Sequence, residues 1–325
     1  MNERRKLIVA IGALALTTPL AVVAQTQGAK PARIGILGPG SAASNAGVVA
    51  ALLVELRALG YVEGKNIALE PRWIEAALDR LPALAAELVG LKVDAILTLQ
   101  TPSAQAAKQA TRAIPIIMAG VADPVASGLI ASLARPGGNI TGLSGATSDL
   151  AAKTLELLRD MLPATRRVGV LANSADPFSK VFVERIEFAG RHLGINLTTI
   201  QVRGEEGLEA AFAELTKAKA GAVIVQPSLP LKRAADLAIK YRLASASPLI
   251  GFTANGGLLA YAAHQAERVR DIAFYLDKIL KGAKPADLPV QQPRRFEMVV
   301  NLKTAKAIRL TVPGGFLVRA DKVIE

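Results

Sequence analysis

Small polar residues recur in the sequence wherever a short apolar segment ends. Five such loops read Gly38-Pro39-Gly40-Ser41, Gln100-Thr101-Pro102-Ser103, Gly120-Val121-Ala122-Asp123-Pro124, Asn173-Ser174-Ala175-Asp176-Pro177 and Gln226-Pro227-Ser228. Hydroxyl and amide groups beside free backbone N–H groups suit a polar or anionic ligand, because the N-terminus of a helix carries about half a positive charge. The same residue types also cap helices without any ligand. One loop alone therefore says little, but five such loops facing one cleft favour a binding site.

Two of these loops suggest how a ligand with two opposite charges would be held. Thr101 is predicted to be the N-cap of a helix and Pro102 its first residue, so the segment from Thr101 to Ser103 would hold a carboxylate. Asp123 would balance an ammonium group on the same ligand. The residues that we predict to contact the ligand are Ser41, Thr101, Ser103, Asp123, Asn173 and Ser228.

Several neighbouring residues have a simpler structural interpretation. Asp149 and Asp176 are most simply helix caps. Trp73, the one tryptophan, is expected to pack against a helix at 78–90 more than to stack on a ligand. Arg72 beside it contacts either an anion or solvent.

Motifs typical of enzymes are weak in this sequence. There is no cysteine, and the two histidines lie far apart, so thiolate catalysis, most metal sites and a histidine-dependent triad are disfavoured. The segment 38–43 fits a loose G-x-G-x-x-G/A dinucleotide motif with Glu70 further on, and 61–65 has a Y-x-x-x-K spacing. Chance explains both better than a shared cofactor site. We predict no catalytic residue, no cofactor and no metal.

Apolar segments of strand length alternate with segments of helical period from Arg33 onward. This order predicts an α/β fold with parallel sheets covered on both faces. The strands are expected at 33–37, 67–73, 94–99, 114–119, 139–144, 167–171, 196–202, 221–226, 248–252 and 296–301. The helices are expected at 44–59, 78–90, 102–112, 178–193, 205–218, 229–243 and 265–281.

The α/β pattern begins a second time after about 130 residues. Arg167-Val168-Gly169-Val170-Leu171 repeats Arg33-Ile34-Gly35-Ile36-Leu37 almost residue for residue. Such a restart indicates two similar lobes and not one long sheet. Ligands of parallel sheets bind at the carboxyl ends of the strands, which is where the five polar loops lie.

The first residues have the composition of an export signal. Arg4-Arg5-Lys6 precedes an apolar segment from Leu7 to Val23, and small residues follow. We predict a signal peptide at 1–24, because the apolar segment is interrupted at 17–19 and is shorter than the ~20 residues of a membrane-spanning helix. Cleavage of this signal would leave a periplasmic protein. A lipid anchor is not expected, because the chain has no cysteine to carry one. The net charge of +12 is spread out, which disfavours nucleic-acid binding.

The sequence also resembles a known family, the ABC-transporter substrate-binding proteins of the periplasmic-binding-protein-like type I fold. Within it, the chain looks like the subgroup that includes binders of aromatic amino acids. The segments that carry the resemblance are 59–66, Arg72-Trp73, 80–88, 106–111, 123–126, 133–143, 278–285 and 301–306. One departure is Asn173-Ser174, where family members often have Asn-Pro.

The resemblance implies two doubly wound parallel-sheet lobes joined by three crossings, with the ligand held in a hinged cleft between them. On that basis 31–145 plus 263–285 form lobe 1, and 146–262 plus 286–325 form lobe 2. The implied function is delivery of an amino acid or related small carboxylate to an ABC permease in the inner membrane by a monomer that closes on its ligand. A periplasmic sensor that signals to a membrane receptor, and an exported NAD(P)-type oxidoreductase, remain as alternatives.

Overall fold

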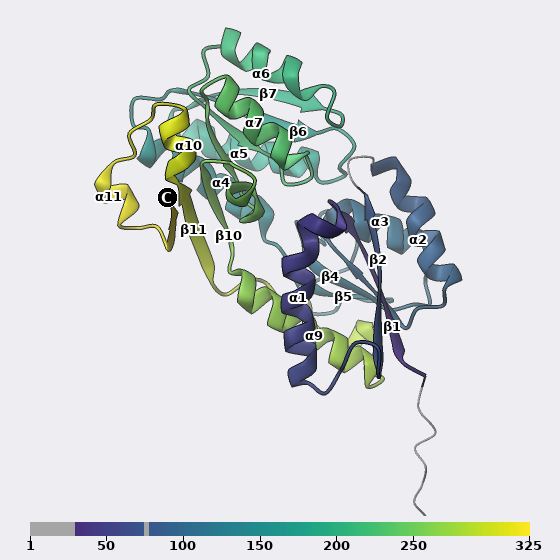
Figure 1. The fold of residues 1–325 in the computed structure, drawn as a ribbon. Helices are drawn as coiled ribbons and strands as arrows, with labels where there is room; N and C mark the ends of the chain where they lie inside the picture. The colour runs from purple at the N-terminus through teal and green to yellow at the C-terminus, as the bar shows by residue number, and fades with distance from the viewer. Residues whose placement is uncertain (1–29, 75–77) are drawn as a thin grey trace, which may run out of the picture. The chain divides into compact units, whose positions relative to one another are not determined.

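Two β-sheets organise the part of the chain that the structure, a computed structural model, describes, namely residues 30–74 and 78–325 (Figure 1). The predicted export signal at 1–24 lies outside these residues. None of the helices described is both long and apolar enough to span a lipid bilayer. The α/β fold with two parallel-dominated sheets confirms the fold class expected from the sequence.

The first sheet is wholly parallel and has the strand order β2-β1-β3-β4-β5. Its strands are β1 (Ala32–Pro39), β2 (Ile67–Ile74), β3 (Ala95–Thr98), β4 (Ile116–Val121) and β5 (Ile140–Ser144). Buried side chains of α2 (Leu81–Gly90) and α3 (Gln100–Ala110) pack on one face, and those of α1 (Ala42–Ala58) and α9 (Gln265–Leu280) on the other. A short 3-10 helix, Leu78–Arg80, precedes α2.

The second sheet has the order β12-β11-β10-β9-β8-β6-β7, in which β10 and β11 are antiparallel and the other pairs parallel. Its strands are β6 (Arg167–Asn173), β7 (Asn196–Val202), β8 (Ala222–Val225), β9 (Ala244–Ser247), β10 (Leu259–Ala263), β11 (Phe296–Asn301) and β12 (Lys322–Ile324). Its helices are α4 (Thr147–Met161), α5 (Ser179–Leu193), α6 (Leu208–Lys217), α7 (Leu231–Lys240), α8 (Gly251–Ala254), α10 (Leu302–Ala307) and α11 (Gly314–Leu317). A 3-10 helix at Pro285–Asp287 follows α9.

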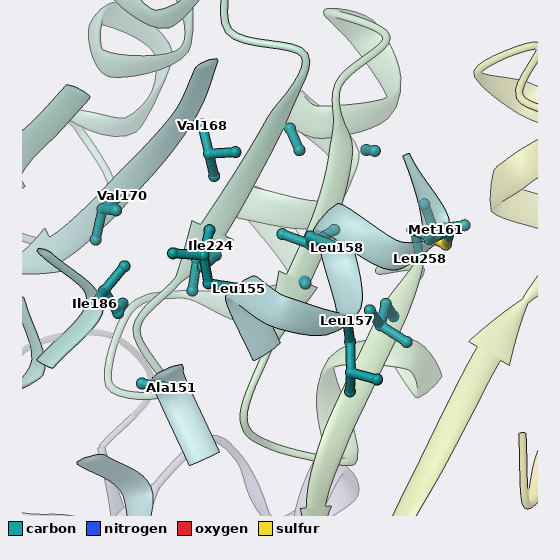
Figure 2. Close-up of a cluster of buried hydrophobic side chains, with 14 of the residues drawn as sticks. Ala151, Leu155, Leu157, Leu158, Met161, Val168, Val170, Ile186, Ile224 and Leu258 are labelled. Atoms are coloured by element: carbon teal, nitrogen blue, oxygen red, sulfur yellow. The ribbon is translucent and has the colours of Figure 1, made fainter. Parts of the chain in front are cut away.

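Helix α4 is the centre of one face of the second sheet. Its Leu155 and Leu158 lie against Val168 of β6 and Ile224 of β8, and all four side chains are almost fully buried (Figure 2). Burying a leucine or valine contributes about 1.5–3 kcal/mol. The second face is covered by α6, α7 and α8. Helices on both faces explain why the inner strands are apolar on both sides.

The repeated sequence motif occupies the same place in each sheet. Gly35 of β1 and Gly169 of β6 lie in strands that have parallel neighbours on both sides. A Cβ atom at Gly35 would lie 3.0 Å from a methyl carbon of Leu88, and one at Gly169 would lie 2.5 Å from a methyl carbon of Leu215. Each glycine therefore lets a leucine from α2 or α6 pack directly on an inner strand of its sheet.

The elements with strong periodicity agree with the sequence. The predicted helix at 78–90 is confirmed by α2, whose buried side chains are Leu81, Leu84, Ala85 and Leu88. The strand predicted at 248–252 is wrong. The strand there is β9, which ends before Pro248, and α8 begins at Gly251. A proline cannot donate to the ladder of an inner strand.

Other elements gave no sequence signal that we recognised. Strand β9 has the sequence Ala-Ser-Ala-Ser, which lacks the β-branched residues typical of strands, yet it is fully buried in the sheet. Helix α4, strand β10 and the elements after β11 were also not predicted. The residue boundaries expected for the two lobes stay a prediction.

Candidate functional site

A cavity of about 840 Å³ lies within the compact unit Pro31–Glu325 and is lined by loops of both sheets. Ser41, Thr101 and Gly145 contribute from the loops after β1, β3 and β5, and Asp176 and Ser228 from those after β6 and β8. These are the carboxyl ends of parallel strands, where α/β folds bind their ligands. The volume falls within the range of small-molecule sites.

The N-terminus of α3 reaches this cavity without a side-chain cap. Leu99 is the N-cap residue and makes no side-chain hydrogen bond, while Gln100 and Thr101 line the cavity. The first N–H groups of a helix have no partner inside the helix, and together with the helix dipole they favour an anion. The start of α3 can therefore hold a carboxylate.

Thr101 is not the N-cap that its sequence suggested. The helix begins two residues earlier than predicted, at Gln100, and the Oγ1 atom of Thr101 instead accepts a hydrogen bond from the backbone N–H of Ala122 at 3.3 Å. This contact joins the loop after β3 to the loop after β4. Pro102 is accordingly the third residue of the helix and not the first.

Backbone strain is concentrated at two helix starts beside the cavity. Among the described residues, six that are not glycine have a positive φ, and four of them follow the C-cap of a helix, where this conformation is common. The remaining two are Gln100 (φ 67°) at the start of α3 and Ala146 (φ 47°) before α4. Such residues cost about 1–3 kcal/mol and cluster at functional sites. The side chain of Gln100 also donates to the carbonyl of Pro227 at 3.2 Å.

Ser41 has a different environment from Thr101. Its Oγ atom accepts a hydrogen bond from the N–H of Ser44 at 3.2 Å, and the Ser44 hydroxyl accepts from the N–H of Ser41 at 2.9 Å. The two residues form a capping box at the start of α1. Ser41 lines the cavity, but its oxygen already serves the helix.

Asp176 is the buried carboxylate of the cavity. Its side chain accepts hydrogen bonds from the N–H of Phe178 at 2.9 Å and from Nε2 of Gln226 at 2.8 Å. Burial raises the pKa of Asp176 above its usual value, an effect that these two donors partly oppose. Among the residues described, no lysine, arginine or histidine forms an ion pair with Asp176. A buried charge of this kind favours a cationic partner.

Two more predicted residues, Asn173 and Ser228, surround this carboxylate. The N–H of Asn173 donates to Oε1 of Gln226 at 2.8 Å, and its side chain donates to the carbonyl of Ser228 at 3.0 Å. The Oγ atom of Ser228 is buried and has no hydrogen bond to any residue that the structure describes. Asn173 thus shapes the loop, while the hydroxyl of Ser228 is still available.

The structure divides the six predicted residues into two groups. Ser41, Thr101 and Ser228 line the cavity, whereas Ser103, Asp123 and Asn173 are not among its lining residues. Asp123 accepts a hydrogen bond from the N–H of Ala126 at 3.0 Å within its own loop. Ligand contact by any of the six stays a prediction.

Sequence reasoning gave no binding role to the charged residues that line the cavity, among them Asp176 and Arg268. Asp176 was interpreted as a helix cap, but α5 begins at Ser179 with Phe178 as its N-cap, and no side chain caps it. Arg268 lies among other charged residues of α9. The sequence signal for Arg268 is its position: Ile272, Tyr275 and Ile279 follow it at helical spacing and are all buried, which places Arg268 on the buried face of the helix.

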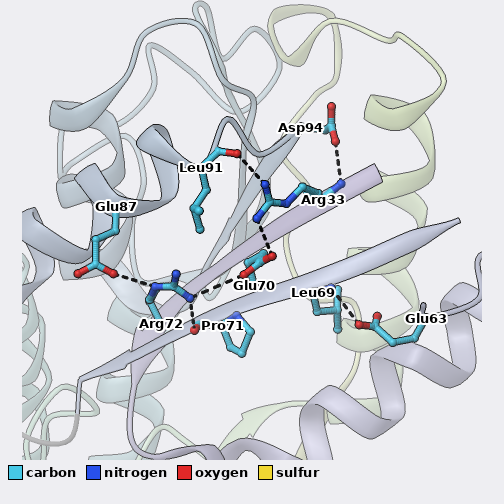
Figure 3. A network of polar contacts seen from close by, with 9 residues as sticks. All are labelled: Arg33, Glu63, Leu69, Glu70, Pro71, Arg72, Glu87, Leu91 and Asp94. Atoms are coloured by element: carbon cyan, nitrogen blue, oxygen red, sulfur yellow. Dashed lines mark hydrogen bonds and ion pairs between the residues drawn. The ribbon is translucent and has the colours of Figure 1, made fainter. Parts of the chain in front are cut away.

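Glu70, which fitted the dinucleotide motif, and Arg72, expected to contact an anion or solvent, have partners within the protein instead. Glu70 accepts a hydrogen bond from Arg33 at 2.7 Å, and Arg72 pairs with Glu87 at 2.9 Å (Figure 3). Neither Glu70 nor Arg72 lines the cavity. Trp73 also lies outside the lining and packs with the cluster under α1 and α9, not with α2 as expected.

Comparison with known proteins explains this arrangement. Residues 33–324 match the family model of the ABC transporter substrate binding proteins. The chain belongs to this family. Its members bind small molecules and work with ABC transporters, so the cavity is the expected position for a ligand in a substrate-binding protein.

Individual proteins resemble this chain in sequence or in structure. A tyrosine-binding protein of Clostridioides difficile is 29% identical over 77% of this chain and 72% of the relative. The structure of an ABC domain with L-Trp from Streptococcus pneumonia is 26% identical, covers 91% of this chain and 100% of that one, and has a TM-score of 0.82. A conserved domain protein from Vibrio cholerae, 24% identical over 90% of this chain and 100% of that one, has a TM-score of 0.83.

Proposed function

We propose that this substrate-binding protein captures an amino acid or a closely related zwitterion outside the cytoplasm and delivers it to an ABC importer. The supporting observation is the presence of two opposite binding features in one cavity. The uncapped start of α3 favours a carboxylate, and the buried carboxylate of Asp176 favours an ammonium group. In this proposal Asp176 takes the role that the sequence suggested for Asp123.

The two features come from different sheets, which gives the ligand a mechanical role. The start of α3 follows β3 of the first sheet, and Asp176 follows β6 of the second. A ligand that contacts both would stabilise a closed arrangement of two hinged lobes. To move the population from 1:99 to 99:1, the ligand must favour the closed form by about 5.5 kcal/mol.

Export completes the proposal. We infer that residues 1–24 direct the chain to the periplasm and are removed, and that the mature protein acts as a monomer beside an ABC permease. The relatives that bind tyrosine and L-Trp support an amino-acid ligand in general terms.

A thermal-shift screen of the mature chain tests the binding step. The panel contains the common amino acids and matched molecules that lack either the ammonium or the carboxylate. A true ligand at 100 times its dissociation constant adds about 2.7 kcal/mol to the free energy of unfolding. We expect amino acids to stabilise the protein, and we expect the analogues without the ammonium or without the carboxylate not to stabilise it. If no amino acid or small carboxylate stabilises it, the proposed function is wrong.

A further inference from the structure

Arg268 is placed where an apolar residue would be expected. It lies on the buried side of α9, one turn before Ile272, and its side chain is half-buried and lines the cavity. Burying part of a guanidinium group is costly unless a partner compensates for the lost water. The position of Arg268 therefore requires an explanation that packing alone does not give.

The charge of Arg268 has no counterpart within the described residues. Its guanidinium group makes no ion pair or hydrogen bond with them. Arg295 of the lining also lacks an ion pair with the described residues, but it is exposed to solvent, and two other cations of the lining are paired. Lys232 contacts Asp236 at 2.5 Å, and Arg233 contacts Glu209 at 2.8 Å. Burial lowers the pKa of Arg268, and the more distant carboxylate of Glu297 only partly offsets this effect. An anion in the cavity would supply the missing partner.

The loop after β4 leaves room for this arginine. Gly120 has a φ of 87°, and a Cβ atom there would lie 3.6 Å from Cδ and 3.7 Å from Nη1 of Arg268. The guanidinium group thus lies over the Gly120 backbone. Ala122, two residues further along, donates its N–H to Thr101 at the start of α3. Cα atoms two residues apart are separated by at most about 7 Å, so Arg268 and the start of α3 are within reach of one small ligand.

Aromatic side chains are scarce in the lining, which bears on the rest of the ligand. Phe178 is the one phenylalanine, tyrosine or tryptophan among the described lining residues, and it is 1% exposed. Trp73 is packed in the core of the first sheet. The cavity therefore offers little aromatic stacking but does offer an unpaired guanidinium group, and planar bidentate recognition of a carboxylate is what arginine does best.

We infer that Arg268 binds a second carboxylate of the ligand, so that the substrate is an acidic amino acid or a related amino dicarboxylate. This inference rests on the proposed function and narrows its ligand. The α-carboxylate lies at the start of α3, the ammonium group at Asp176 and the side-chain carboxylate at Arg268. The relatives' aromatic ligands, tyrosine and L-Trp, carry no second carboxylate.

Isothermal titration with two isosteric pairs tests the assignment. L-Glutamate is compared with L-glutamine, and L-aspartate with L-asparagine, because each pair differs in charge but hardly in shape. We expect the acidic member of at least one pair to bind the mature protein ten times more tightly or better. Arg268→Gln should weaken its binding about 100-fold, the size of a lost charge-assisted pair, and leave the amide member within threefold.

Arg270→Gln is the matched control. Arg270 lies two residues further along α9, is exposed and is 4.0 Å from Glu55, outside the cavity lining. This variant should bind like the wild type, and a thermal melt of each variant shows whether it folds.

The possible outcomes separate the two proposals. If the amide members or the aromatic amino acids bind as tightly as the acidic ones, Arg268 does not select the ligand, although the protein still binds amino acids. The same conclusion follows if Arg268→Gln weakens both members of a pair equally, because the arginine then holds the α-carboxylate. If no amino acid binds at all, the proposed function fails as well.

Discussion

The loops after β1 and β6 follow strands of almost the same sequence, but their polar groups are bonded differently. After β1, Ser41 and Ser44 exchange hydrogen bonds and close the start of α1. After β6, the chain buries the carboxylate of Asp176, and Ser228 beside it keeps an unbonded hydroxyl. The first loop satisfies its own polar groups, whereas the second leaves a charge and a hydroxyl for another molecule.

This difference shows that the repeated strand determines the fold and not the site. In both sheets the motif provides a glycine on which a leucine packs, so packing explains why the motif occurs in both halves of the chain. In the proposed function the ligand is bound by the residues after the strand, which form a capped helix start at Ser41 and a buried acid at Asp176.

Replacing the buried acid should have the largest effect on binding. Asp176→Asn removes the negative charge that we assign to the ammonium group of the ligand. We expect the dissociation constant to rise about 100-fold or more, since a charge-assisted hydrogen bond contributes about 1.5–3 kcal/mol and leaves an unpaired cation when lost. Asp123→Asn, outside the cavity lining, is the matched control and should change affinity less than twofold by calorimetry. Equal effects of the two variants would contradict the assignment.

The two packed glycines provide a test of stability. Gly169→Ala places a methyl group 2.5 Å from a methyl carbon of Leu215, and we expect it to lower the free energy of unfolding by about 2 kcal/mol. Gly35→Ala meets Leu88 at 3.0 Å, a contact that a small shift of the leucine relieves. The lower entropy of the unfolded chain offsets part of that cost, so a change within about 0.5 kcal/mol is expected. Urea melts measure both values, and a reversed order would show that the second half is not the more tightly packed.

The sequence predicted most of this fold but only part of the site. Amphipathic periodicity is a local property, so α2 with its buried leucines could be recognised directly. Strand β9 could not, because Ala-Ser-Ala-Ser is a strand only through the neighbours that bury it. The site shows the same limit. The polar loops pointed to three residues that line the cavity, Ser41, Thr101 and Ser228. Only three-dimensional packing shows that Asp123 bonds within its own loop and that Asp176 is buried.

Acidification should weaken binding in a way that depends on Asp176. Its pKa is raised by burial, so the ligand-free protein takes up a proton at a higher pH than an ordinary aspartate, whose pKa is about 3.9. Above the raised pKa the carboxylate is ionised, and affinity should be independent of pH. Below it, affinity should fall about tenfold per pH unit, or about 1.4 kcal/mol, until the carboxylate of the complex is protonated too. Titrations from pH 7 downward should show this slope in the wild type and not in Asp176→Asn. An identical slope in both would assign the proton to another group.

The smallest expected effect separates the two serines that line the cavity. Ser41→Ala removes the cap of α1 and should lower the free energy of unfolding by about 1 kcal/mol. Ser228→Ala removes a buried hydroxyl without a hydrogen bond, so the ligand-free protein should lose no stability. The Ser228→Ala variant should bind the ligand more weakly if that hydroxyl contacts the ligand, whereas Ser41→Ala should leave the affinity nearly unchanged. Chemical denaturation and calorimetry on the same two variants therefore give opposite rankings if the first loop serves the fold and the second serves the ligand.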